Sequence, residues 1–351
     1  MKFIHIADIH LGARPDAGEA YSGERPRELW DTFSQVIDCC NQEKAQLLLI
    51  AGDLFHRQPL LRELKEVSYL FSRLKHTQVV LIAGNHDFIR KNSYYRTFSW
   101  PKHVHMLSGE TLGHVVFPEL DTAVYGLSYH SREITEPLYD SAKAKGLARC
   151  EILLAHGGDE KHIPIRREAL KKSGFDYIAL GHIHRRRSLT EGFAEYAGSL
   201  EPTDKNDIGK HGYIVGELDE DGLRLKFVPI AGREYLHLAL QVKETMTEGS
   251  VCDWIRRMID ERGRQHMYCF VLQGKRDVDV EFDTSRMNPF KNVLEVVDET
   301  RPAYDFERLS EENRGNLIGR FIESFGGCEE GSVEYQALCE GVEALLSGEC
   351  L

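Results

Sequence analysis

The chain has 351 residues, of which 42% are hydrophobic and 28% charged, and its formal net charge is −12. This length and composition allow a substantial core and favour one main domain with one or two smaller additions. No apolar run approaches the roughly 20 residues of a membrane helix, and the start MKFIHIADIH lacks the features of a signal peptide. The eight Cys residues include no C-x-x-C pair and fit reduced thiols. We therefore expect a cytoplasmic protein with no membrane partner.

The negative charge is uneven along the chain. From Arg286 to the end there are 6 basic and 14 acidic residues, a net charge of −8, whereas the preceding 285 residues carry only −4. Acidity argues against a nucleic-acid partner, because phosphate binding uses Lys and Arg. Its concentration in the C-terminal segment weakens that objection for the rest of the chain.

The first hundred residues alternate between strand and helix patterns. Apolar runs at 2–7, 46–51 and 78–83 predict strands, and amphipathic periodicity at 26–42 and 60–74 predicts the helices between them. This order indicates a largely parallel sheet. A further short helix is expected at 92–98.

The chain then turns to short strands, with one helix expected near 132–148. Strands are expected at 104–107, 114–117, 123–127, 151–155, 177–180 and 193–197, and a hairpin joins 211–218 to 223–228. Together these elements predict an α/β domain over 1–232, in which two facing sheets form a β-sandwich flanked by helices.

The remaining third differs in character. Strands at 237–243 and 267–273 flank a helix at 250–262, which predicts a small α+β cap of β-α-β order over 233–287. The acidic range 288–351 carries two amphipathic helical patterns separated by Gly326-Gly327. These helices either pack on their own domain or dock a partner.

Candidate metal ligands lie at or just beyond the ends of the apolar runs of the first domain. Five blocks carry them: Asp8-x-His10, Gly52-Asp53, Gly84-Asn85-His86-Asp87, His156 and Gly181-His182-x-His184. Open α/β sheets bind ligands beyond the carboxyl ends of their strands. Carboxylate, amide and imidazole groups suit a pair of divalent cations, and one carboxylate can bridge two ions. The blocks therefore predict a two-metal centre of the kind that hydrolyses phosphoesters.

Basic residues flank these blocks. Arg185, Arg186 and Arg187 follow His184 directly, and Arg90 lies close behind Asp87. They either form a solvated basic surface or neutralise phosphates of the substrate beyond the reacting one. Among the other histidines, we interpret His5 as a packing residue and His162 as a surface or structural one. His211 either packs in its loop or approaches the substrate.

The five blocks, in this order, closely resemble the calcineurin-like metallophosphoesterase superfamily. The resemblance implies two ion sites that share Asp53, one formed by Asp8, His10, Asp53 and His184 and the other by Asp53, Asn85, His156 and His182. It also implies manganese as the activating ion, although iron and zinc accept the same ligand types. It further implies that His86 donates a proton to the leaving oxygen and that Asp87 orients it.

Within that superfamily the chain looks like the SbcD-like branch of DNA double-strand-break repair nucleases over about 1–230. The segments Phe3–Gly12, Gly52–His56 and Gly198–Leu200 carry this likeness. It implies a metal-dependent DNA exonuclease, with endonuclease activity as an open addition, in which His56 places the scissile phosphate. It also implies a homodimer through the helices at 60–74 and 92–98, and an SbcC-like coiled-coil ATPase held by the C-terminal helices.

Two alternatives stay open. A phosphodiesterase for small nucleotides or other phosphoesters would use the same metal centre, and a non-catalytic subunit that binds DNA ends or an ATPase would keep the same fold. The complete ligand set with His86 and Asp87 favours an enzyme, and the cap and terminal helices favour the nuclease.

Overall fold

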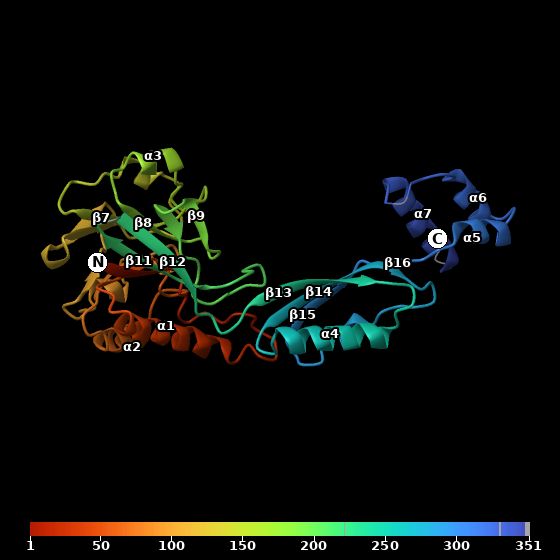
Figure 1. Cartoon of the computed structure of the whole chain (residues 1–351), viewed down its shortest axis with the longest axis horizontal. Helices are drawn as coiled ribbons and strands as arrows, with labels where there is room; N and C mark the ends of the chain where they lie inside the picture. Colours follow the sequence, from red (N-terminus) through yellow and green to blue (C-terminus); the bar gives the residue numbers. More distant parts are fainter. Residues whose placement is uncertain (221, 330, 348–351) are drawn as a thin grey trace. The chain divides into compact units, whose positions relative to one another are not determined.

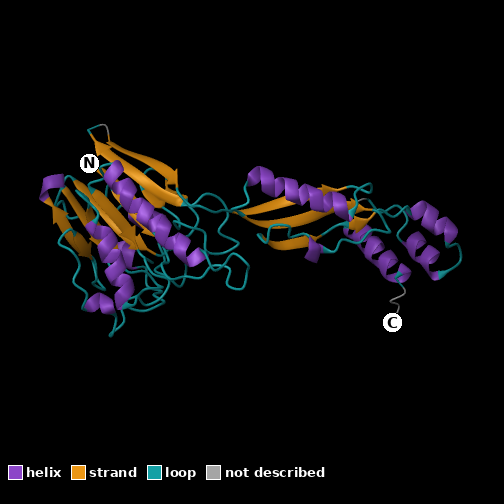
Figure 2. Cartoon of the chain, turned by 90° about the horizontal axis from the view of Figure 1, so that it is seen from below, coloured by secondary structure: helices purple, strands orange, loops and turns teal. Residues whose placement is uncertain are grey.

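A computed structural model describes residues 1–220, 222–329 and 331–347. The chain divides into two compact units, Met1–Tyr235 and Leu236–Leu351. Figures 1 and 2 show the sheets and helices that make up each unit. Within the described ranges, no helix is long and apolar enough to cross a membrane. Seven of the eight cysteines are free thiols, and Cys350 lies outside the described residues.

The first sheet of unit 1 has six strands in the order β12-β11-β1-β2-β3-β4. These strands are β1 (Lys2–Ile6), β2 (Leu47–Ala51), β3 (Gln78–Ile82), β4 (Val104–Met106), β11 (Gly212–Asp219) and β12 (Gly222–Pro229). The first four run parallel, and the β11–β12 hairpin adds an antiparallel edge beside β1. The parallel arrangement brings the carboxyl ends of β1, β2 and β3 to one edge of the sheet.

The second sheet of unit 1 also has six strands, in the order β5-β6-β7-β8-β10-β9. They are β5 (Gly113–Phe117), β6 (Thr122–Gly126), β7 (Cys150–His156), β8 (Tyr177–Gly181), β9 (Arg187–Thr190) and β10 (Ala194–Tyr196). The four central strands β6, β7, β8 and β10 pair in parallel, and β5 and β9 form antiparallel edges. The sequence patterns did not indicate β9, which is short and polar.

Side-chain alternation along the strands builds the sandwich. In β1, Phe3 packs between the two sheets, whereas Ile4 and Ile6 face the outer helices. Helices α1 (Arg25–Gln42) and α2 (Leu61–Ser72) bury their apolar faces against that outer side. A third apolar layer covers the outer face of the second sheet, near α3 (Arg167–Lys171). The predicted α/β fold, two facing sheets flanked by helices, is confirmed.

Two expected helices of unit 1 are wrong. The range 132–148 forms only the 3-10 turn η3 (Leu138–Ser141), since Pro137 cannot donate a helical hydrogen bond and Gly146 has a φ of 68°. The range 92–98 forms only the 3-10 turn η1 (Tyr94–Arg96), which the Ser93 side chain caps. Both segments are therefore loops that present side chains beside the sheets.

Unit 2 begins with a small sheet covered by one helix. Its elements are β13 (Tyr235–Val242), α4 (Glu248–Arg262), β14 (Met267–Arg276), β15 (Val293–Asp298) and β16 (Arg301–Pro302). Helix α4 buries Val251, Ile255 and Ile259, spaced four apart, against the strands. Strands β15 and β16 pair with β14, so two strands precede the helices within the acidic range 288–351.

Three short helices follow in unit 2, namely α5 (Phe306–Glu312), α6 (Leu317–Ser324) and α7 (Val333–Leu346). Side chains of Asp305, Asn316 and Ser332 cap their first turns. The first amphipathic pattern is thus two helices rather than one, because Gly315, with a φ of 84°, breaks the chain between them. The three helices share a small apolar cluster around Ile322, Leu338 and Val342.

The buried His5 imidazole makes the stability of unit 1 sensitive to acid. Its Nδ1 lies 2.9 Å from the Tyr177 hydroxyl between the sheets, and burial lowers its pKa to about 3. The unfolded chain, with an ordinary His pKa near 6.5, therefore binds the proton first, and stability is lost as pH falls from about 6.5 towards 3. We expect this loss to approach about 1.4 kcal/mol per pH unit in metal-free protein. Denaturant titrations of wild type and His5→Gln should show a stability difference that changes with this slope below pH 6.5 and is constant above pH 7.5.

Candidate metal centre

Six of the seven candidate ligands lie on loops that follow β1, β2, β3 and β8, and His156 is the last residue of β7. Asp8, His10, Asp53 and His182 adopt positive φ values of 52°, 50°, 50° and 98°. Such left-handed backbone is costly for residues other than glycine and is typical of functional sites. Two hydrogen bonds between the loops after β1 and β2 stabilise this backbone conformation. The Asp8 amide donates to the Gly52 carbonyl at 3.2 Å, and the His10 amide donates to the Asp53 carbonyl at 3.0 Å.

The structure brings all seven side chains into one cluster. His156 Nε2 lies 2.9 Å from Asn85 Oδ1 and 3.4 Å from Asp53 Oδ2. His10 Nε2 lies 2.9 Å from His184 Nε2 and 3.9 Å from Asp53 Oδ2. Asn85 Oδ1 is also 3.2 Å from His182 Nδ1, and both Asp8 oxygens accept from the His182 amide. The Asp53 carboxylate thus lies between His10 and His156.

The hydrogen bonds of the His156 ring indicate that this cluster can bind cations. His156 Nδ1 is 2.9 Å from the Ala51 carbonyl, which only accepts, so this nitrogen carries the hydrogen. In the neutral ring, Nε2 then has only a lone pair and faces the Asp53 and Asn85 oxygens. Lone pairs that converge in this way repel each other unless a proton or cation lies among them. The donor set therefore suits divalent ions held by nitrogen and oxygen ligands.

Glycines of the motifs make room for the cluster. A Cβ atom on Gly84 would lie 2.2 Å from Asp53 Oδ1 and 2.7 Å from His156 Nε2. On Gly181 it would lie 2.0 Å from the Ala51 carbonyl oxygen. These two glycines are thus required by close packing around the ligands.

The electrostatics of the metal-free cluster favour positive charge. Burial opposes protonation of His156, but the charges of Asp53 and Asp8 outweigh it and raise the pKa to about 9. Burial likewise opposes protonation of His184, and the hydrogen bond to Asp207 and the charge of Asp8 raise its pKa to about 9. Burial raises the pKa of Asp53, but the His156 charge and hydrogen bond lower it well below its usual range. Cations that bind here would displace protons, which makes metal affinity dependent on pH.

His86 lies at the mouth of the cluster, where its ring is 4.8 Å from that of His10. Its amide donates to Asp53 Oδ1 at 2.9 Å, and its Nδ1 lies 3.0 Å from the His56 carbonyl. The carbonyl only accepts, so Nδ1 carries a hydrogen and Nε2 is left for other contacts. His56 lies beside it, with ring centroids 4.9 Å apart.

Asp87 does not orient His86, contrary to the expectation. Its carboxylate is fully buried and accepts from the Gly84 amide at 2.8 Å, the Phe55 amide at 3.2 Å and the Tyr95 hydroxyl at 2.8 Å. Adjacent side chains on an irregular turn diverge, so Asp87 points under the loop while His86 points out of it. Asp87 instead joins the loop after β3 to the loop after β2.

An arginine-lined pocket of about 260 Å³ adjoins His86. Its lining comprises His56, Arg57, Gln58, Asn85, His86, Phe88, Arg90 and Arg132. Arg90 extends over the Phe88 ring, 4.9 Å from its centroid, and the Arg57 guanidinium is held by Glu63 at 2.9 Å. The pocket therefore offers guanidinium groups beside the candidate metal ligands, a setting that suits phosphates.

Arg185, Arg186 and Arg187 are exposed and do not line this pocket. Arg186 pairs with Glu195 at 3.4 Å, and Arg187 lies over the Tyr196 ring at 5.0 Å. They belong to the loop and strand that follow His184, on the second sheet.

Sequence reasoning missed Arg57, Arg132 and two carboxylates, Asp159 and Asp207, that contact His182 and His184. Asp159 follows His156 by three residues, and Arg57 directly follows His56, so proximity to a motif was the available signal. Asp207 and Arg132 lie in loops without periodicity. His162, expected to be a surface or structural residue, bonds to Asp159, and His211 is buried against Ser199.

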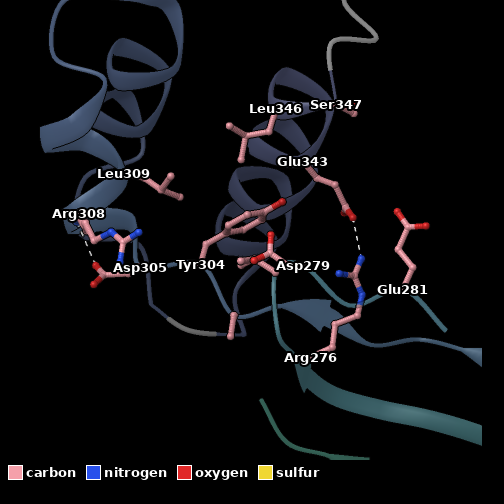
Figure 3. Close-up of a pocket in the computed structure, with 12 residues that line it drawn as sticks. Arg276, Asp279, Glu281, Tyr304, Asp305, Arg308, Leu309, Glu343, Leu346 and Ser347 are labelled. Atoms are coloured by element: carbon pink, nitrogen blue, oxygen red, sulfur yellow. Dashed lines mark hydrogen bonds and ion pairs between the residues drawn. The ribbon is translucent and has the colours of Figure 1, made fainter. Parts of the chain in front are cut away.

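A larger hollow, about 390 Å³, lies in unit 2 between the small sheet and the terminal helices (Figure 3). Arg276 and Glu343 pair across it at 2.9 Å, and the Asp305 carboxylate accepts from the Arg308 amide. These four residues thus make contacts within unit 2, and the lining of the hollow contains none of the candidate ligands.

Comparison with known proteins agrees with the geometry. The family model described as calcineurin-like phosphoesterase matches residues 1–186. The chain therefore belongs to the calcineurin-like metallophosphoesterases, a family of hydrolases that use divalent metal ions. The predicted superfamily is confirmed.

Among its relatives are proteins of DNA repair. The DNA double-strand break repair protein Mre11 of Methanocaldococcus jannaschii is 29% identical over 269 residues, 71% of this chain and 72% of that protein. The protein of the same name from Sulfolobus acidocaldarius is 29% identical over 268 residues, 69% and 67% of the two chains. The uncharacterized metallophosphoesterase YhaO of Bacillus subtilis is 30% identical over 250 residues, 65% and 60% of the two chains.

Proposed function

We propose that this protein is a metal-dependent DNA nuclease, an exonuclease with endonuclease activity as a second possibility to be tested. One observation carries the proposal: the cluster of seven candidate metal ligands adjoins a pocket that contains His56, His86 and three arginines. Similarity to proteins named for DNA double-strand break repair supports DNA as the substrate.

The residues suggest a division of labour. Asp8, His10, Asp53 and His184 would hold one ion, and Asp53, Asn85, His156 and His182 the other, with manganese as the expected metal. Such ions polarise a phosphoester and lower the pKa of water. The position of the Asp53 carboxylate between His10 and His156 supports the proposal that it would serve both sites.

His86 would give a proton to the leaving oxygen. The His56 carbonyl holds its Nδ1, so Nε2 is the nitrogen available to the substrate. The His56 ring, which lies beside it at a tilt of 34°, would contact the scissile phosphate. In this mechanism the His86 ring would transfer the proton, and Asp87 would contribute only by stabilising the loop that carries His86.

The substrate class decides between this proposal and a phosphodiesterase for small nucleotides. Purified full-length protein with Mn²⁺ is incubated with end-labelled linear duplex, closed circular single strands and cyclic nucleotides. Release of mononucleotides from linear DNA supports the exonuclease, and cleavage of the circles adds the endonuclease. Hydrolysis of small esters alone would overturn the DNA assignment, and no hydrolysis with two bound ions would favour a non-catalytic subunit.

The pocket arginines should bind phosphates of a DNA strand. We expect Arg132→Gln or Arg90→Gln to raise KM for duplex DNA about 3- to 10-fold with little change in kcat, because each removes one phosphate contact. The salt dependence of KM should weaken by about one ion per substitution. Arg27→Gln, which alters an exposed arginine paired with Asp31 on α1, is the control. Equal effects of all three variants would contradict a phosphate-binding pocket.

Two exposed apolar surfaces support our proposal of two partners. Leu60, Leu61 and Tyr69 on and beside α2 are 38%, 41% and 62% exposed, and we propose that they form a homodimer interface. In unit 2, Leu317 and Val333 are 65% and 77% exposed, and we propose that α5–α7 dock an SbcC-like coiled-coil ATPase in the cytoplasm. Tyr69→Glu should produce monomers in sedimentation, whereas Leu317→Glu should release a co-expressed ATPase without changing the oligomeric state.

A further inference from the structure

We propose that Asp207 and Asp159 are positioning residues of the metal centre, which act through His184 and His182 respectively. Each carboxylate fixes the orientation of one histidine ring and determines which ring nitrogen faces the cluster. This inference rests on the proposed metal-dependent function.

Asp207 holds His184 from behind. Its Oδ2 lies 3.0 Å from His184 Nδ1, and this oxygen also accepts from the Thr203 amide and hydroxyl, each at 2.9 Å. A carboxylate only accepts, so Nδ1 of His184 carries the hydrogen. Nε2 is then the nitrogen that faces the cluster, 2.9 Å from His10 Nε2.

The loop that carries Asp207 is itself braced. His211 is 3% exposed, its Nε2 lies 2.9 Å from the Asp207 carbonyl, and its Nδ1 lies 2.9 Å from the Ser199 hydroxyl. The loop from Ser199 to His211 is thereby closed on itself. This brace gives the Asp207 carboxylate a defined place relative to His184.

Asp159 holds His182 by the opposite nitrogen. Its Oδ2 lies 2.6 Å from His182 Nε2, and its Oδ1 accepts from the Lys161 and His162 amides at 2.8 and 2.9 Å. His182 Nε2 therefore carries the hydrogen, and Nδ1 faces Asn85 Oδ1 at 3.2 Å. His184 thus presents Nε2 to the cluster, because Asp207 holds its Nδ1, whereas His182 presents Nδ1, because Asp159 holds its Nε2.

The other two ligand histidines lack such a carboxylate. His156 Nδ1 bonds to the Ala51 carbonyl, and within the described chain His10 Nδ1 is buried without a hydrogen-bond partner. A carboxylate behind a ligating imidazole raises its basicity more than a neutral carbonyl does, and loss of such a partner typically weakens metal binding 10- to 100-fold. The structure thus concentrates this support on His182 and His184, which are assigned to different ions.

Metal binding tests the inference directly. Metal-free wild type, Asp207→Asn and Asp159→Asn are titrated with Mn²⁺ by calorimetry and by electron paramagnetic resonance, which separates free and bound Mn²⁺. We expect two ions on the wild type, and about 10- to 100-fold weaker binding of one ion in each variant. The controls are Asp140→Asn and Asp38→Asn, ion-paired aspartates that are 18% and 49% exposed, against 14% for Asp207 and 46% for Asp159.

A double-mutant cycle shows whether each carboxylate acts through its histidine. In a His184→Ala background, Asp207→Asn should cause no further loss of affinity, and Asp159→Asn should behave likewise in a His182→Ala background. Wild-type affinity in both aspartate variants, or additive losses in the cycles, would overturn the inference while leaving the proposed function intact. A wild type that binds no Mn²⁺ would instead overturn the metal centre itself.

Discussion

Replacing His86 by asparagine should lower the rate of phosphodiester hydrolysis by about 10²- to 10⁴-fold and leave two metal ions bound. Asparagine has no titratable proton to give to a leaving oxygen. The backbone contact from residue 86 to Asp53 Oδ1, at 2.9 Å, does not depend on the side chain and should persist. The measurements are kcat on labelled DNA with Mn²⁺ and the Mn²⁺ stoichiometry of the same sample.

The matched control is His76→Asn, an exposed histidine that follows α2. It should hydrolyse DNA at the wild-type rate. A His86→Asn variant that retains both the ions and full activity would remove His86 from the chemistry. Loss of both ions would mean that His86 serves the cluster and not the leaving group.

Replacing Gly84 by alanine should abolish binding of at least one ion and destabilise the metal-free protein by about 1–3 kcal/mol, the usual cost of overpacking. The added methyl group would lie 2.2 Å from Asp53 Oδ1 and 2.7 Å from His156 Nε2, both buried. Either side chain has to move, and both are candidate ligands. Calorimetric titration with Mn²⁺ and denaturant unfolding without metal measure the two effects separately.

Gly23→Ala is the control, because a Cβ there meets nothing within 4 Å and its backbone has no positive φ. It should keep the wild-type metal affinity and stability. Two ions bound by Gly84→Ala with wild-type affinity would show that Asp53 and His156 are not held as the structure places them.

That the candidate ligands cluster was predictable from sequence because they lie at or shortly after the ends of apolar strands, as His156 ends β7 and Asp53 follows β2 by two residues. The carboxyl ends of parallel strands lie at one edge of a sheet, so the residues that follow these strands could be expected to lie close together. The apolar faces of α1 and α2 were predictable for the same reason, since helical periodicity defines a buried side.

Residues on irregular loops were not predictable in this way. Asp207 reaches His184 across 23 positions, and Asp87 turns away from His86 although the two are adjacent. Strand β15 escaped detection because it lies at the start of an acidic segment and is half exposed. In each case tertiary contacts determine the side chain's place, and no local period encodes them.

The candidate ligands come from both sheets of unit 1: Asp8 and Asp53 follow strands of the first sheet, whereas His156 ends β7 and His182 follows β8 in the second. Bound ions would therefore link the two sheets, in addition to the apolar packing and the few hydrogen bonds between them. Ligand binding to the folded state alone adds stability that grows with metal concentration. We therefore expect chelation of the ions to destabilise both sheets at once, so that the metal concentration would affect the lifetime of the folded protein as well as its rate of hydrolysis.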